Sequence, residues 1–403
     1  MQLTALGLIC FIPQVLSNFR ERASIVLVAL IGLTILLPAI QLIPLPAPVW
    51  QNLPGRDLVA ATFGVLGDMD RAFPISVDRA RTITAALALL APLTAIILTN
   101  AGNRRDGRAV LLAIVGLTML NFAFGALQFA ADGLYLYSDL TDRRFFGFFA
   151  SHNTSGLFMV IGLIALVGYD RMSHAKLGVR LTHLLCALLL IIAVVLTKSR
   201  SSTALLLVPL GMFALYSLLD MRSASKRVRL IFVGGLTALI ATGAILATTN
   251  SQLGETWQRY TDLEDSRPDI WEDTLYGIDR YWPVGSGMGT FDEVFQVEES
   301  LEALIAARAG RAHNEYLELA LEAGVAGLAL VAAWAIFLVL CWWRRRSGDQ
   351  AVPATVAALS LLAIAAQGLV DYPMRNMALL TVAGLLVALL TAQPARKRDR
   401  VSV

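Results

Sequence analysis

His313 is the side chain best suited by type to move a proton in this sequence. A histidine changes charge near neutral pH, so it can take a proton from a hydroxyl and return it later. It stands in the polar run Arg311-Ala-His-Asn-Glu-Tyr-Leu-Glu318, in a chain with only 4 histidines. A histidine at the start of a helix can instead be structural, through capping or a backbone bond. We therefore expect His313 either to accept a proton in a reaction or to cap a helix.

A set of basic side chains is suited to bind phosphate. Arg200 lies in the short turn Lys198-Ser-Arg-Ser-Ser202, between two apolar segments. Arg267 and Arg311 come from a long polar segment. A guanidinium meets two phosphate oxygens at a fixed fork geometry, so several arginines at one face fit a lipid diphosphate. Contact with lipid headgroups or with acidic side chains is the alternative. The further candidates are Lys198, Arg143, Arg144 and Arg375.

Other polar groups near these residues favour structural roles. Asp371 and Arg375 are spaced to pair across one turn. The run Gly285-Ser-Gly-Met-Gly289 follows no clear strand, so we expect a tight turn and not a phosphate cradle. The acidic residues after His313 do not all share its helix face, and we expect them to be solvated or ion-paired: Glu315, Glu318 and Glu322.

The elements that must position these residues are predicted to be membrane helices. The chain has 403 residues, of which 57% are hydrophobic and only 16% charged, against about 25% charged in soluble domains. Lipid offers backbone groups no hydrogen-bond partner, so helices are the expected spanning form. The sequence predicts an all-α polytopic membrane protein with about 11 apolar segments. These are about 3–16, 25–43, 82–100, 109–130, 154–168, 181–197, 203–219, 230–247, 320–342, 351–370 and 377–392.

The first of these segments is short for a span and has no charged flank before it. We expect an earlier helix to be missing from the N-terminus, which would bring the number of spans to about 12. A signal peptide is less favoured, because no basic region precedes the apolar residues.

The distribution of basic residues predicts the orientation. Lysines and arginines gather in alternate short loops, whereas acidic residues outnumber basic ones in the long loop 249–315. By the positive-inside rule the long loop faces outward and the C-terminus inward. The outer face would also carry residues 44–81, 131–153 and 371–376. We divide the chain into a transmembrane bundle (1–248), an outer catalytic loop (249–318) and C-terminal helices with a basic tail (319–403).

Within the long loop the sequence predicts three helices. Ser266 is a candidate N-cap, and the apolar residues from Ile270 to Ile278 recur at helical spacing until Trp282-Pro283 ends the helix. A second helix is expected from Asp292 to about Ala309. A third is expected to begin near His313 and to continue into the next span.

Several function classes are disfavoured by what the sequence lacks. The cysteines Cys10, Cys186 and Cys341 form no CxxC pair and lie in or beside apolar segments. No P-loop or dinucleotide-binding motif is present. We therefore expect no metal, no nucleotide cofactor and no nucleic-acid partner.

The order of the motifs resembles the O-antigen ligase and polymerase superfamily. The matching elements are Ser199-Arg200-Ser201, Arg267 with Trp271, Pro283-Val-Gly-Ser-Gly-Met-Gly289, Ala312-His-Asn-Glu-Tyr-Leu-Glu318 with Gly324, and the upstream run Phe145-Phe-Gly-Phe-Phe-Ala-Ser-His-Asn153. The resemblance covers roughly residues 75–390. It implies a GT-C-like glycosyltransferase that takes a glycan from undecaprenyl diphosphate at the periplasmic face of the bacterial inner membrane, inverts the anomeric centre and uses no metal.

The resemblance also assigns roles to residues. His313 would serve the acceptor hydroxyl as the catalytic residue. The substrate-binding set would be Arg200, Arg267, Lys198, Arg144, Arg311, Asn314 and Trp271. The partners would be the lipid-linked glycan donor, a lipid- or glycan-linked acceptor and membrane lipids.

The product stays open within the superfamily. The favoured reading is a ligase that transfers glycan to lipid A core. The alternatives are a polymerase for O-antigen or exopolysaccharide and a protein O-oligosaccharyltransferase. Outside the superfamily, a transporter or flippase is the main rival, but transporters place ionisable residues deep within spans, and the spans here carry almost none.

Overall fold

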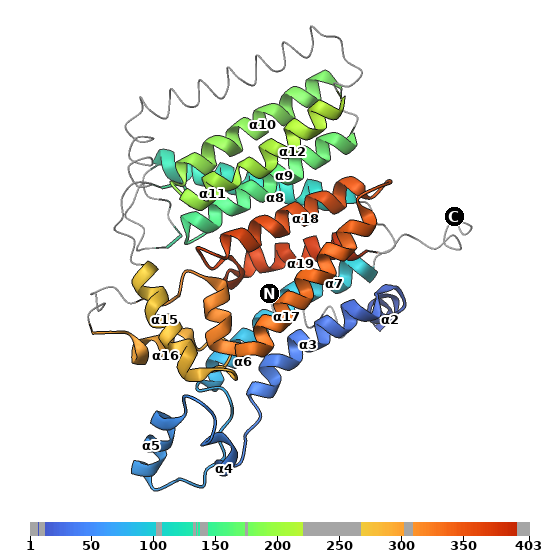
Figure 1. Cartoon of the computed structure of the whole chain (residues 1–403). Coiled ribbons are helices and arrows are strands. Elements are labelled where there is room, and N and C mark those ends of the chain that lie inside the picture. Colours follow the sequence, from blue (N-terminus) through green and yellow to red (C-terminus); the bar gives the residue numbers. More distant parts are fainter. Residues whose placement is uncertain are drawn as a thin grey trace. The chain divides into compact units, whose positions relative to one another are not determined.

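The computed structural model describes residues 7, 13–101, 107–131, 134, 136–137, 144–173, 176–220, 267–301 and 309–392 (Figure 1). The chain divides into two compact units, residues 1–106 with 266–403 and residues 107–265. We refer to them as the first and the second unit and describe each by itself. The described elements of both are helices, and the β-structure seen is a single bridge between Leu45 and Phe73.

The second unit is built around one buried helix. This is α9 (His152–Ser173), against which α8 (Gly107–Ala131), α10 (Leu177–Leu196), α11 (Arg200–Leu205) and α12 (Leu207–Asp220) pack. Of the most apolar 18 residues in each helix, 72% are buried in α9, 33% in α8 and 17% in α10. α9 therefore forms the core of this unit, and its neighbours are more exposed. Glycines allow the close approach, since a Cβ on Gly162 would lie 2.4 Å from Thr118.

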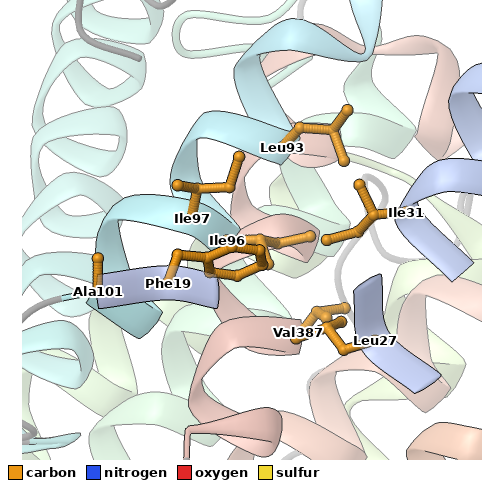
Figure 2. Close-up of a cluster of buried hydrophobic side chains, with 8 residues drawn as sticks. All are labelled: Phe19, Leu27, Ile31, Leu93, Ile96, Ile97, Ala101 and Val387. Carbon is orange, nitrogen blue, oxygen red and sulfur yellow. The ribbon is translucent and has the colours of Figure 1, made fainter. Parts of the chain in front are cut away.

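Among its described residues, the first unit contains seven further helices that pack together. They are α2 (Pro13–Arg22), α3 (Ile25–Gln41), α6 (Arg79–Ala88), α7 (Leu90–Ala101), α17 (Glu315–Arg345), α18 (Ala351–Gln367) and α19 (Met377–Thr391). α7 packs along α19 and α2, while α17 runs beside α3 (Figure 1). Figure 2 shows the apolar cluster that joins α2, α3, α7 and α19: Phe19, Leu27, Ile31, Leu93, Ile96, Ile97, Ala101 and Val387.

The polar part of the first unit has smaller cores. α4 (Ala47–Trp50) and α5 (Asp57–Leu66) pack Trp50 against Phe63 edge to face, and Phe73 meets Phe63 in the same way. α15 (Arg267–Tyr281) and α16 (Phe291–Glu298) enclose a second cluster with the start of α17: Tyr281, Phe291, Val294, Phe295, Ala312 and Leu321. The short 3-10 helix η2 (Pro373–Arg375) joins α18 to α19.

The predicted spans correspond to helices wherever the structure describes them. Six stretches are long and apolar enough to cross a membrane: 79–101, 107–131, 152–173, 177–196, 200–219 and 315–345. Four shorter apolar helices add 25–41, 57–66, 351–367 and 377–391. The predicted segment 230–247 and most of 3–16 lie outside the described residues, as do Ser266 and Arg143.

One predicted helix boundary is wrong, and prolines divide two of the predicted spans into two helices each. α6 ends at Ala88 and α11 at Leu205, four residues before Pro92 and Pro209. A proline ring clashes with the carbonyl four residues earlier and lacks an N–H, so each apolar stretch divides there. α16 ends at Glu298, well before Ala309, and Ser300 then donates through its N–H to the Asp273 carboxylate at 3.1 Å.

Candidate functional site

The glycine run 285–289 is a packing turn against a break in α17. Gly324 has non-helical angles (φ 53°, ψ −143°), so the helix is interrupted there. The N–H groups of Ser286 and Gly287 donate to the carbonyls of Leu321 and Glu322, both at 2.9 Å. A Cβ on Gly324 would lie 2.0 Å from the Pro283 carbonyl oxygen. The turn thus binds the carbonyls that the break leaves open, which confirms the predicted tight turn.

Two side chains from the N-terminal part of the chain hold this turn. Gln41 donates to the Glu322 carbonyl and accepts from the Met288 N–H, both at 2.9 Å. Arg56, only 1% exposed, donates to the Gly285 carbonyl at 2.9 Å, with its guanidinium 5.1 Å from the Tyr281 ring centre. Burial lowers the pKa of Arg56 to about 10, partly offset by Tyr281. The base of the site is therefore rigidly built from distant segments.

His313 lies just outside the first turn of α17. Asn314 is the N-cap residue, and its side-chain oxygen accepts from the N–H groups of Tyr316 and Leu317. The capping alternative for His313 is therefore wrong, since the next residue caps the helix. The backbone before the helix is held as well, because the Trp271 indole N–H donates to the Ala312 carbonyl at 2.8 Å.

His313 faces a buried carboxylate. Its Nδ1 lies 3.6 Å from Oδ1 of Asp371, whose side chain is 3% exposed while that of His313 is 34% exposed. Among the described residues neither of these two buried atoms has a hydrogen-bond partner. The Tyr372 ring packs edge to face on the imidazole, with ring centres 5.0 Å apart. A small closing movement would let Nδ1–H donate to Asp371 and leave Nε2 with the lone pair that accepts a proton.

The predicted local pair between Asp371 and Arg375 is wrong. Arg375 instead contacts Glu318 and Glu322 through Nη2, at 3.2 and 2.9 Å. Both glutamates are fully buried and together present two carboxylates to the guanidinium, whereas Asp371, which is also buried, faces His313. The expectation that the glutamates after His313 are solvated or ion-paired is met by ion pairing.

Two predicted arginines lie close to the histidine. Arg311 donates to Glu318 at 3.3 Å and is 36% exposed. Burial raises the pKa of Tyr372, Asp371 raises it further, and Arg311 and Arg267 lower it. Arg267, the first residue of α15, therefore lies within electrostatic reach of the phenol that packs on His313. The first unit brings together Arg267, Trp271, Arg311, His313 and Asn314 from the predicted set, and adds Asp371 and Tyr372.

The second unit brings together the other predicted cations. Arg144 donates through Nη1 to Nε2 of His152 at 2.7 Å. The adjacent Phe145 N–H donates to the carbonyl of Leu196, the last residue of α10. Lys198 and Arg200 follow at the turn into α11, where Ser199 is the N-cap. The run 144–146 and the turn at Lys198 thus meet at one end of this unit.

Backbone strain marks one residue in each group. Lys198 and His313, with φ of 56° and 49°, are the non-glycine residues with positive φ in the part of the chain that the structure describes. A left-handed backbone is uncommon for non-glycine residues, less so for histidine than for lysine, and it persists where the surroundings favour it. Such positions cluster at functional sites, and both residues belong to the predicted set.

Over the described residues these features define a helical protein with candidate membrane spans and a histidine that faces a buried carboxylate. Comparison with protein families gives it a more specific placement: the model of the family described as O-antigen ligase matches residues 185–332. The resemblance read from the motifs is thereby confirmed for this part of the chain, which contains Arg200, Arg267 and His313. Asp371 and Arg375 follow the matched region. A search of curated proteins finds no match to the chain.

Sequence reasoning missed Asp371 and Tyr372 as partners of His313. Both stand in the short turn after an apolar segment, at the same predicted face of the membrane as His313. A lone carboxylate at the end of a span is costly to bury unless a charged or hydrogen-bonding partner contacts it. This cost is the feature of the sequence that could have indicated a more distant partner for Asp371.

Proposed function

We propose that the chain is a glycosyltransferase that moves a glycan from undecaprenyl diphosphate to an acceptor hydroxyl, with lipid A core as the favoured acceptor. The family match supports ligase- or polymerase-type chemistry in general. One observation carries the proposal further. His313, inside the matched region, faces the buried Asp371 at 3.6 Å, so that a short movement would give a general base an orienting carboxylate.

The proposed reaction is a single displacement at the anomeric carbon. The acceptor oxygen forms a bond to this carbon while the bond to the diphosphate oxygen breaks, which inverts the anomeric centre. The hydroxyl proton passes to Nε2 of His313, and Asp371 stabilises the imidazolium that results. The diphosphate leaves with the electron pair. The donor is already activated, so the reaction needs no nucleotide.

Binding of the diphosphate is assigned to the arginines. As the family resemblance implies, Arg267, Arg200 and Lys198 are proposed to contact phosphate oxygens and stabilise the charge that develops on the leaving group. Arg144 and Arg311 are assigned secondary contacts. Trp271 and Asn314 already bind backbone beside His313, so any contact that they make with substrate would come from their remaining surface.

The proposed location is the bacterial inner membrane, with the site facing the periplasm. The acidic long loop and the basic short loops support this orientation. A phosphatase fused within residues 290–300 should be active, whereas one fused after Arg346 should be inactive. Activity of the second fusion would indicate the opposite orientation and contradict a periplasmic site.

The decisive experiment is transfer by the purified full-length protein in lipid nanodiscs. The donor is an undecaprenyl-diphosphate-linked oligosaccharide, and the assayed acceptors are lipid A core, a second donor molecule and a serine-containing peptide. Glycosylated lipid A core is the expected product. Elongated donor or glycopeptide would reassign the protein to polymerase or protein glycosylation. Donor flipping in proteoliposomes without any transfer would overturn the proposal in favour of a flippase.

A further inference from the structure

The side chain of one arginine faces three carboxylates on the first two turns of α17. Arg375, the last residue of η2, has a side chain that is only 15% exposed. Glu315, Glu318 and Glu322 are spaced by three and four residues, so they form one stripe along the helix. Arg375 Nε lies 3.7 Å from Glu315, and its Nη2 lies 3.2 Å from Glu318 and 2.9 Å from Glu322, in each case at Oε2.

The other oxygen of each carboxylate accepts a backbone N–H from a different segment. Glu315 Oε1 accepts from Met374 at 2.6 Å, in the turn that carries Asp371. Glu318 Oε1 accepts from Ala312 at 3.0 Å, next to His313. Glu322 Oε1 accepts from Phe291 at 3.3 Å, just after the glycine turn. The three glutamates therefore bind three separate backbone segments to α17, and Arg375 forms ion pairs with all three glutamates.

The charge balance makes this arginine hard to replace. Burial lowers the pKa of Arg375, but Glu322, Glu318 and Glu315 raise it by more, so the net shift is upward. Arg311, whose side chain is partly exposed, forms an ion pair with Glu318 alone among these three glutamates. Without Arg375 three carboxylates would face one another across a buried space with a single remaining cation. Such carboxylates repel each other or take up protons, and either response loosens the backbone contacts.

We propose that Arg375 is a positioning residue for the His313–Asp371 pair. It acts through Glu318 on the backbone before His313 and through Glu315 on the turn after Asp371, and it does not need to touch substrate. Its effect on geometry is independent of the reaction, whereas its effect on turnover rests on the proposed glycosyl transfer. The test therefore needs one readout for each.

The first readout is the rate at which diethylpyrocarbonate modifies His313, followed by peptide mass mapping of purified full-length protein in nanodiscs. The reagent attacks the neutral imidazole, so loss of the Asp371 contact and greater exposure should both speed the reaction. Arg375→Gln and Arg375→Lys are expected to raise the rate severalfold. His183 is the internal reference, because its Nδ1 contacts Asp170 at 2.7 Å within the second unit, and its rate should stay the same.

The second readout is transfer from the undecaprenyl-diphosphate-linked oligosaccharide. Both variants should lose kcat, by roughly 100-fold for a displacement of about 1 Å, while the KM for the donor stays near that of the wild type. Lysine should rescue little, because one ammonium cannot reproduce the Nε and Nη contacts. The matched control is Arg280→Gln. Arg280 also bridges two carboxylates, Glu298 and Asp57, but neither of them contacts the His313 loop.

The outcomes separate cleanly. An unchanged His313 modification rate in both Arg375 variants would overturn the inference, and so would an equal change in Arg280→Gln. If Arg375→Gln does not fold, Arg375→Lys decides, because it keeps the charge and removes only the fork. If His313 responds as expected but the wild type transfers no glycan, the proposed function fails and the positioning role stands.

Discussion

Replacing Asp371 by asparagine would test the proton-transfer geometry most directly. The change keeps the size of the side chain but removes its charge, and it can turn an N–H toward Nδ1 of His313. The imidazole would then favour the tautomer with hydrogen on Nε2, which cannot accept the acceptor's proton. The variant should still bind donor, because the arginines assigned to the diphosphate are unchanged.

The size of the effect follows from the separation. At 3.6 Å, an imidazolium and a carboxylate attract by roughly 1 kcal/mol in water and by roughly 5 kcal/mol at an effective dielectric constant of about 20. Because the ring of His313 is about a third exposed, the true value lies between these limits. Loss of that stabilisation in the transition state corresponds to a fall in kcat of about 10- to 10³-fold.

The assay is steady-state transfer by purified protein, with donor concentration varied to separate kcat from KM. Asp170→Asn is the matched control, since Asp170 pairs with His183 in the same Asp–His manner at 2.7 Å within the second unit. It should leave transfer within about twofold of the wild type. A wild-type kcat for Asp371→Asn, or an equal loss in Asp170→Asn, would refute the assigned role of Asp371.

Two further substitutions test other parts of the structure. Arg267→Lys should weaken donor use by roughly 10- to 100-fold, because an ammonium loses the bidentate contact; wild-type donor KM would indicate simple headgroup attraction. Gly324→Ala should lower the free energy of unfolding by about 2–3 kcal/mol or more, because its φ of 53° and the 2.0 Å approach of the Pro283 carbonyl oxygen exclude a Cβ. Gly116→Ala, with nothing within 4 Å of the added carbon, is its control.

The helices were largely predictable from sequence because lipid solvation leaves few alternatives for apolar segments. Every predicted span with described residues contains a helix, and α15 ends at the expected Trp282-Pro283. The breaks before Pro92 and Pro209 were also readable, since proline rules act locally. The early end of α16 was not, because the Asp273 contact that receives Ser300 joins residues 27 positions apart.

The candidate site was predictable only in part. Residue type and motif order single out His313, Arg267 and Arg200 as candidates, because their chemistry is specific. The partner of His313 depends on how the turn after α18 meets the start of α17, and local spacing does not show that contact. Local spacing therefore gave Asp371 the wrong partner, while Arg375 pairs with Glu315, Glu318 and Glu322. Tertiary contacts between buried charges decide such pairings, since the strongest available interactions prevail once solvent is excluded.

The exchange of His313 for asparagine distinguishes catalysis from architecture at this position. The left-handed backbone at φ 49° suits asparagine better than any other non-glycine residue. Alanine there adds backbone strain, so His313→Ala would lose both the imidazole and some stability. His313→Asn should keep thermal stability within about 1 kcal/mol of the wild type and still lose transfer by two to four orders of magnitude, the usual contribution of one general base.

The result is informative in either direction because Asn314 already caps α17. Asparagine at position 313 therefore cannot rescue activity by restoring a cap, and it cannot accept a proton at neutral pH. If purified His313→Asn transfers glycan at nearly the wild-type rate, His313 has no part in the chemistry. Stabilisation of the leaving diphosphate by arginine would then be the main source of catalysis, and Asp371 would be a buried carboxylate whose partner serves only the fold.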